Sequence, residues 1–134
     1  MTHDKPDTGE MILLVEDEPP IRVLMRRLLE GAGYRIVETR NAHEALSKAR
    51  QHAGELGLLV TDIVMPDMDG FALERRLSSE YPHLEVLFLS GHAVDSVAVR
   101  GGLKESGKDF LLKSFSPQAL LEKVQMVLRR HGQA

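Results

Sequence analysis

Five short apolar runs, each about the length of a β-strand, alternate in this chain with segments that have the periodicity of amphipathic helices. The runs are Met11–Val15, Tyr34–Val37, Leu58–Thr61, Val86–Leu89 and Phe110–Leu112. Continuous apolar strands that alternate with helices are typical of a parallel sheet covered on both faces. Because the crossovers in such a sheet are right-handed, the pattern predicts a doubly wound α/β fold.

The segments between the apolar runs carry helix start and stop signals. These signals are Pro19-Pro20 with Gly31 or Gly33 for the first helix, Asn41 with Glu44 for the second, Gly70 for the third, and Ser116-Pro117 with Gly132 for the last. The segment Val94–Leu103 is weaker, because its valines and the pair Gly101-Gly102 lower helix propensity. We expect this fourth helix to be short or mobile.

The length and composition predict one domain in a reducing compartment. The chain has 134 residues and no cysteine, which excludes disulfides and thiol chemistry. Residues 1–10 have no apolar periodicity and are interpreted as a disordered leader or linker before a domain at 11–132. No apolar run is long enough to span a bilayer. We therefore expect a cytoplasmic protein that does not enter the membrane.

The charge balance argues against a nucleic-acid partner. Seventeen basic and twenty acidic side chains give a formal net charge of -3. The sequence has no block of basic residues that could bind along the phosphate backbone of a nucleic acid. The informative charges are instead acidic and lie at strand ends. Glu16 and Asp17 follow the first strand, Asp62 ends the third, Ser90 ends the fourth and Lys113 ends the fifth. In a doubly wound sheet, ligands bind beyond these carboxyl ends.

Three carboxylates at one sheet edge repel one another unless a cation neutralises them. With oxygen ligands and no Cys or His cluster, Mg²⁺ is the cation that fits. The charges of Glu16, Asp17, Asp62, Lys113 and a divalent ion sum to zero, and the pocket can then accept a phosphoryl group, with Asp62 as nucleophile. Three other acidic residues, Glu18, Asp67 and Asp69, are interpreted as helix N-caps.

The motifs together resemble the receiver domains of two-component response regulators. The resemblance rests on Glu16-Asp17 after Ile12–Val15, on Asp62–Pro66 with Gly70 after it, on Ser90-Gly91, and on Phe110–Lys113. It extends from Met11 to Gly132 and implies a flavodoxin-like sheet of five parallel strands in the order 2-1-3-4-5. The stretches Val86–Ala93 and Lys113–Pro117 look most like the receivers of hybrid sensor histidine kinases.

The resemblance implies a role for each residue of the site. Asp62 would accept a phosphoryl group from a phosphohistidine. Mg²⁺ would be bound by Asp17 and Asp62, by Glu16 through water, and by the backbone carbonyl of Val64. Ser90 would bind a phosphoryl oxygen, Lys113 would pair with the phosphoryl group, and the ring of Phe110 would reorient when Ser90 moves. Such a domain is not an enzyme, although it catalyses its own phosphoryl transfer and slow dephosphorylation.

The resemblance also implies the partners, which are a histidine kinase or a phosphotransfer protein. Kinase domains attached to the receiver in the full-length protein fit the likeness to hybrid kinases. No effector domain follows Ala134 in this sequence, so we expect the output to pass through a partner's surface or through domains absent from this chain.

Two departures from the family pattern affect the fifth strand. Ser114 follows Lys113 where the family has a proline after a cis peptide. A cis bond costs about 3 to 4 kcal/mol without proline and about 0.5 to 1 kcal/mol with it. We nevertheless expect the Lys113–Ser114 peptide to stay cis. Phe110 lacks the hydroxyl of a tyrosine, so its inward position should be favoured by burial alone.

Three other readings compete with a phosphoacceptor receiver. A phosphatase with an aspartyl phosphate would need a second acid two residues after the nucleophile, where this chain has Val64. A nucleotide-binding module would need a glycine-rich turn after the first strand, where Glu16–Pro20 stands. A phosphorylation-independent pseudo-receiver, which keeps the fold as a binding module, stays open on the residues alone.

Overall fold

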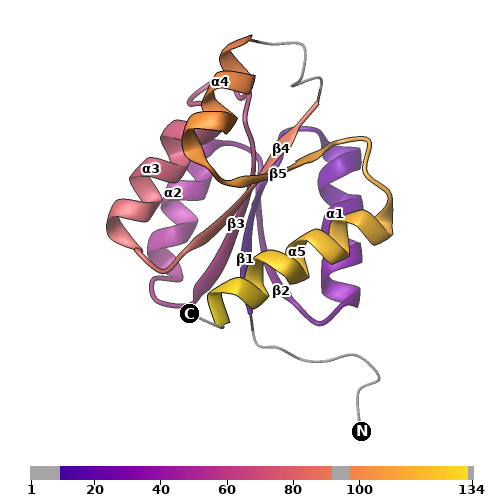
Figure 1. Cartoon of the computed structure of the whole chain (residues 1–134). Helices are drawn as coiled ribbons and strands as arrows, with labels where there is room; N and C mark the ends of the chain where they lie inside the picture. Colours follow the sequence, from indigo (N-terminus) through magenta and orange to yellow (C-terminus); the bar gives the residue numbers. More distant parts are fainter. Residues whose placement is uncertain (1–9, 92–96, 133–134) are drawn as a thin grey trace, which may run out of the picture.

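The computed structural model describes residues 10–91 and 97–132, so nearly all of the expected leader and the start of the segment Val94–Leu103 lie outside the described residues. The elements are β1 Met11–Val15, α1 Pro19–Gly31, β2 Arg35–Thr39, α2 Ala42–Gln51, β3 Leu56–Asp62, α3 Gly70–Glu80, β4 Glu85–Ser90, α4 Val97–Ser106, β5 Asp109–Leu112 and α5 Pro117–Gly132 (Figure 1). Within these ranges no helix is both long and apolar enough to cross a bilayer.

The five strands form one parallel sheet in the order β2-β1-β3-β4-β5, which confirms the predicted flavodoxin-like topology. Helices α1 and α5 cover one face, and α2, α3 and α4 cover the other (Figure 1). Each face has its own apolar cluster, because alternate residues of β1, β3 and β4 point to opposite sides. The sheet is therefore buried on both sides at its centre.

The strands begin and end close to the predicted positions, and β1 matches its prediction. β2 starts one residue later than predicted and extends to Thr39, whose hydroxyl donates a hydrogen bond to the carbonyl of Leu14 at 2.9 Å. β3 extends to Asp62, so the predicted nucleophile is the last residue of a buried strand. Strand β4 ends at Ser90, as predicted.

Side-chain caps fix where three of the helices begin. The amide of Glu44 donates to Asn41 Oδ1 at 2.8 Å, and the amide of Ala72 donates to Asp69 Oδ1 at 2.8 Å. At α5 the Ser116 hydroxyl oxygen accepts from the amide of Ala119 at 3.1 Å. These contacts confirm the N-caps predicted at the second and last helices and at Asp69.

The other two predicted caps, Asp67 and Glu18, behave differently. Asp67 lies between β3 and α3, but its carboxylate accepts from the amides of His43 at 2.9 Å and Ala42 at 3.4 Å, and so it caps α2. Glu18 occupies the N-cap position of α1 without a side-chain capping bond. The capping interpretation is thus wrong for the Glu18 side chain, because that carboxylate is bound elsewhere.

Helix α4 runs from Val97 to Ser106, so it includes the glycine pair and ends three residues beyond Leu103, its predicted end. A Cβ atom added to Gly102 would lie 2.4 Å from the ring of Phe71 in α3, so the missing side chain allows α4 to pack closely there. The Phe71 ring in turn lies 4.8 Å from that of Phe88 in β4. The ten described residues of α4 equal α2 in length, so the expectation of a short or mobile helix stays a prediction. Packing compensates for the poor helix propensity of the glycine pair.

Candidate functional site

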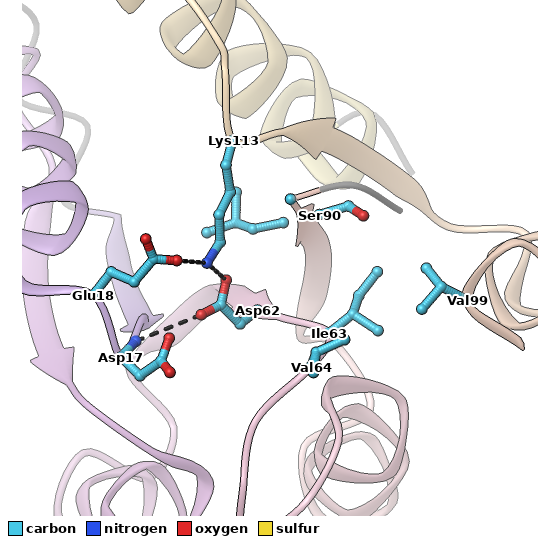
Figure 2. Close-up of a pocket in the computed structure, with 10 residues that line it drawn as sticks. Asp17, Glu18, Asp62, Ile63, Val64, Ser90, Val99 and Lys113 are labelled. Atoms are coloured by element: carbon cyan, nitrogen blue, oxygen red, sulfur yellow. Dashed lines mark hydrogen bonds and ion pairs between the residues drawn. The ribbon is translucent and has the colours of Figure 1, made fainter. Parts of the chain in front are cut away.

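The carboxyl ends of β1, β3, β4 and β5 converge on one open pocket (Figure 2). Its lining includes five predicted residues, Asp17, Asp62, Val64, Ser90 and Lys113, together with Glu18, Ile63, Leu89, Gly91 and Val99. Glu16 lies beneath the pocket and is fully buried. The structure therefore brings together every predicted site residue except Phe110.

The loop after β1 is fixed by backbone hydrogen bonds. The amide of Glu16 donates to the carbonyl of Thr39 at 3.1 Å, and the Arg22 guanidinium donates to the carbonyl of Glu16 at 2.9 Å. The Glu16 carboxylate turns inward, where its Oε2 accepts from the amide of Glu18 at 3.0 Å. Asp17 is exposed at the pocket, and its amide lies 3.5 Å from Asp62 Oδ2.

Asp62 is held in place by the close packing of α3 against the end of β3. The amide of Gly70 donates to the carbonyl of Ile63 at 2.7 Å. A Cβ atom added to Gly70 would lie 2.2 Å from the carbonyl oxygen of Asp62, so only glycine allows this approach. The Asp62 side chain is 1% exposed and points into the pocket (Figure 2).

The carboxylates of Glu16, Asp17 and Asp62 form a group that fits a metal ion. Each offers an oxygen, and these oxygens lie within 4.8 Å of one another. Glu16 Oε1 is buried and has no hydrogen-bond partner among the described residues, although buried polar atoms are normally satisfied. The three carboxylates offer only oxygen ligands and carry several negative charges, and one of their buried oxygens lacks a hydrogen-bond partner among the described residues. Such a group suits a hard divalent cation such as Mg²⁺.

Lys113 reaches the same cluster from the turn after β5. Its amide donates to the carbonyl of Ser90 at 2.8 Å, which holds the turn against the end of β4. Its ammonium donates to Glu16 Oε2 at 3.0 Å and to Glu18 Oε2 at 2.8 Å. The ammonium also lies 2.8 Å from Asp62 Oδ1, with which it forms an ion pair (Figure 2).

The crowding of charge shifts the pKa of both Asp62 and Lys113. Burial raises the pKa of Asp62 to about 8; the Lys113 ammonium opposes this shift, and the negative charge of Glu16 adds to it. Burial alone would lower the pKa of Lys113, but contacts with Asp62, Glu18 and Glu16 raise it overall. A cation at this cluster would relieve the repulsion that raises the pKa of Asp62.

The predicted cis peptide at Lys113–Ser114 is not observed. No peptide bond within residues 10–91 and 97–132 is cis, so this bond is trans. The reason is the larger cost of a cis bond before a residue other than proline. Lys113 still contacts Asp62, so its predicted position at the site does not depend on a cis bond.

The remaining predicted residues, Ser90, Val64 and Phe110, differ in exposure. Ser90 is 3% exposed and lines the pocket, whereas the Val64 side chain is 74% exposed at its rim. Phe110 is 38% exposed, so the expected inward position is wrong for this structure. Its neighbour in β4, Phe88, is fully buried and fills the interior beside the Phe71 ring.

Sequence reasoning missed three residues that contribute to the site: Glu18, Arg22 and Val99. Glu18 binds Lys113, Arg22 holds the Glu16 carbonyl, and Val99 reaches the pocket from α4. One signal could have identified Glu18, since glutamate is not among the favoured N-cap residues. The contacts of Arg22 and Val99 depend on tertiary packing, and no local sequence motif predicts them.

With this geometry established, comparison with known proteins identifies the class. Residues 12–125 match the family described as response regulator receiver domain, so the chain belongs to that family. The chain is 40% identical over 122 residues to the response regulator GtcR of Aneurinibacillus migulanus. It is 37% identical over 119 residues to the sensor kinase CckA of Brucella abortus. These alignments cover 91% and 89% of the chain, respectively.

A solved structure agrees with these relatives. The crystal structure of the receiver domain from the hybrid histidine kinase CckA superposes with a TM-score of 0.73 at 33% identity, over 88% of this chain and 98% of that one. The chain spans 49% of the length of GtcR and 12% of the length of CckA. The receiver domain is therefore the part that this chain shares with longer proteins.

Proposed function

We propose that this receiver domain accepts a phosphoryl group from a phosphohistidine onto Asp62 in the presence of Mg²⁺. The observation that carries the proposal is that a buried nucleophile, Asp62, lies in the same cluster as a buried carboxylate oxygen that has no hydrogen-bond partner among the described residues. Asp62 is 1% exposed, and Glu16 Oε1 in the same cluster has no hydrogen-bond partner among the described residues. A cation beside the nucleophile accounts for both.

In this proposal Asp17 and Asp62 would bind Mg²⁺, Glu16 would act through a water, and Val64 would offer its backbone carbonyl. The metal supplies positive charge that stabilises the oxygens of the transferring phosphoryl group. The chain's own residues position the reacting oxygen, since Asp62 ends a buried strand and its backbone packs closely against Gly70. Positioning of this kind is the main contribution that phosphoryl transfer requires from a protein.

The transfer exchanges one bond to phosphorus for another. A bond forms between an Asp62 carboxylate oxygen and phosphorus, while the bond from phosphorus to the imidazole nitrogen of the donor breaks and leaves its electron pair on that nitrogen. The Lys113 ammonium and the Ser90 hydroxyl are the donors placed to bind the phosphoryl oxygens. The same residues support slow hydrolysis of the product.

The proposed output passes through the last two strands. When Ser90 moves towards a phosphoryl oxygen, Phe110 in the adjacent strand changes its orientation, and α4 follows because Leu103 and its neighbours line one pocket with Phe110. The partner that supplies the phosphoryl group is a histidine kinase or phosphotransfer protein. The likeness to CckA supports a receiver attached to kinase domains in a longer protein.

The test is to incubate the chain with acetyl phosphate and Mg²⁺ and to measure its intact mass and the modified residue. We expect one added phosphoryl group, mapped to Asp62. Asp62→Asn should abolish this label, and excess chelator should prevent it. The matched control is Asp69→Asn, which lies outside the carboxylate cluster and keeps a favoured N-cap.

Two outcomes would contradict the proposal. Labelling that survives in Asp62→Asn would place the phosphoacceptor elsewhere. A parent chain that takes no label from acetyl phosphate or from a phosphorylated histidine kinase would instead favour the phosphorylation-independent pseudo-receiver.

A further inference from the structure

The contact between Glu18 and Lys113 has no role in the proposed transfer. The Glu18 side chain is 55% exposed, yet its Oε2 accepts a hydrogen bond from the Lys113 ammonium at 2.8 Å (Figure 2). The backbone of Glu18 is fixed separately, because its amide donates to Glu16 Oε2 and its carbonyl accepts from the amide of Arg22. The side chain can therefore change its partner without disturbing the loop.

Glu18 occupies one of the three hydrogen-bond donors of Lys113. An ammonium group has three N–H donors, and Lys113 directs two of them to Glu16 and Glu18. Asp62 Oδ1 lies 2.8 Å from the same ammonium as a third partner, so each of the three donors already faces a carboxylate. An incoming phosphoryl oxygen at this position needs such a donor, so one existing contact of Lys113 must be released.

Of the two hydrogen bonds, the one to Glu18 is the easier to release. Glu16 is fully buried, and loss of its lysine would leave a buried charge without a cation. Glu18 is exposed and becomes hydrated on release, so the contact contributes little to stability. The difference in burial makes Glu18 the contact that Lys113 can exchange.

The local charge leads to the same conclusion. Glu16, Asp17, Glu18 and Asp62 place four carboxylates around one ammonium, and a bound divalent cation would still leave one excess negative charge. The charge balance drawn from the sequence omitted Glu18, so it reached zero. An entering phosphoryl group adds further negative charge, which favours displacement of the exposed carboxylate.

We propose that Glu18 is a positioning residue that holds Lys113 before phosphorylation. Lys113 exchanges Glu18 for a phosphoryl oxygen as the bond between Asp62 and phosphorus forms and the leaving group departs with its electron pair. This inference rests on the proposed function of Asp62. Its consequence is that the parent chain takes up phosphoryl groups more slowly than it would with Lys113 free.

The first test measures the rate of label uptake from acetyl phosphate at saturating Mg²⁺. Glu18→Gln should take up label about two- to fivefold faster than the parent, the range that corresponds to loss of a partly exposed ion pair. Glu18→Asp is the matched variant, because it keeps the negative charge but is one methylene too short to hold Lys113. Glu18→Asp should also take up label faster than the parent. If Glu18 slowed uptake only by repelling the anionic phosphodonor, Glu18→Asp would keep that charge and take up label at the rate of the parent.

A double-mutant cycle with Lys113 provides the second test. If Glu18 acts through Lys113, then Glu18→Gln should not accelerate uptake in a Lys113→Met chain. Circular dichroism shows whether that chain folds, and Glu18→Asp decides the question if it does not. A parent that is never labelled removes the proposed function itself. A labelled parent with unaccelerated Glu18→Asp, or with full acceleration retained in Lys113→Met, overturns the role of Glu18 alone.

Discussion

The centre of the sheet and its β5 edge differ in how firmly they are packed. All five residues of β1 and the last five residues of β3 are buried, and both strands end at the carboxylate cluster. In β5 the residues alternate between half-buried and exposed, and Phe110 and Leu112 are each 38% exposed. Helix α4 beside this edge contains two adjacent glycines.

The difference indicates that the two regions serve different needs. Phosphoryl transfer requires oxygens held at fixed positions, and fully buried strands restrict their movement. A surface that must change when the chain is phosphorylated gains from weaker packing, because small free-energy differences can then shift its arrangement. Two glycines, one in each region, allow the comparison to be tested with the same substitution.

The largest effect is expected for Gly70→Ala at the centre. The new Cβ would lie 2.2 Å from the Asp62 carbonyl oxygen and 3.0 Å from Ile63 Cα, and neither backbone atom can move aside. We expect a loss of about 3 kcal/mol in the free energy of unfolding, measured by urea denaturation. Gly31→Ala is the control, since nothing lies within 4 Å of its added Cβ. Equal stability of the two variants would show that the centre of the sheet accommodates the added methyl group without cost.

The next effect is a gain in stability from Asp62→Asn in metal-free protein. Burial raises the pKa of Asp62 from 3.8 to about 8, so the folded chain is more stable when this carboxyl is protonated. That stability is complete below the unfolded pKa and is lost as the pH rises through the folded value. Asn carries no charge, so the variant should be more stable than the parent by about 2 kcal/mol above pH 8.

The dependence of this stability gain on pH and on Mg²⁺ shows whether it comes from removal of the Asp62 charge. The difference between variant and parent should shrink as the pH falls towards 4, and Mg²⁺ should stabilise the parent but not the variant. Thermal unfolding in chelator and in excess Mg²⁺, followed by circular dichroism, measures both effects. A variant less stable than the parent at every pH would mean that the Lys113 ion pair outweighs the burial of the charge.

The smallest effect is expected for Gly102→Ala in α4. The added Cβ would meet the Phe71 ring at 2.4 Å, but this contact is the outer end of a side chain that can rotate. Better helix propensity offsets part of the cost, so we expect a net loss of about 1 kcal/mol. Gly101→Ala, whose added Cβ would have no described atom within 4 Å, should instead gain stability in the same urea titration. If Gly102→Ala lost as much unfolding free energy as Gly70→Ala, the centre of the sheet and its β5 edge would not differ in how firmly they are packed.

The sequence predicted the architecture because its signals were local and consistent. Apolar strand-length runs, the caps at Asn41 and Ser116, and the position of Asp62 at a strand end all follow from short segments. The convergence of Asp17, Asp62, Ser90 and Lys113 followed from topology alone, since parallel strands end at one edge.

The errors arose where tertiary contacts decided the outcome. The Glu18 side chain could cap α1 or bind Lys113, and only the fold shows that the lysine lies within 2.8 Å. Phe110 was expected inside, but Phe71 and Phe88 occupy the interior next to its strand. Helix α4 ends at Ser106 and not at Leu103 as predicted, and its Gly102 packs on Phe71, a contact that no helix propensity scale includes.

The cap that Asp67 provides has a consequence for the order of folding. The first turn of α2 is satisfied from two sources, because Asn41 binds the amide of Glu44 while Asp67 binds the amides of Ala42 and His43. Asn41 is next to the helix, whereas Asp67 follows β3. During synthesis α2 therefore leaves the ribosome with only the cap from Asn41. Its amides at Ala42 and His43 gain their hydrogen-bond acceptor only after the chain beyond Asp62 has folded and brought Asp67 to the start of α2.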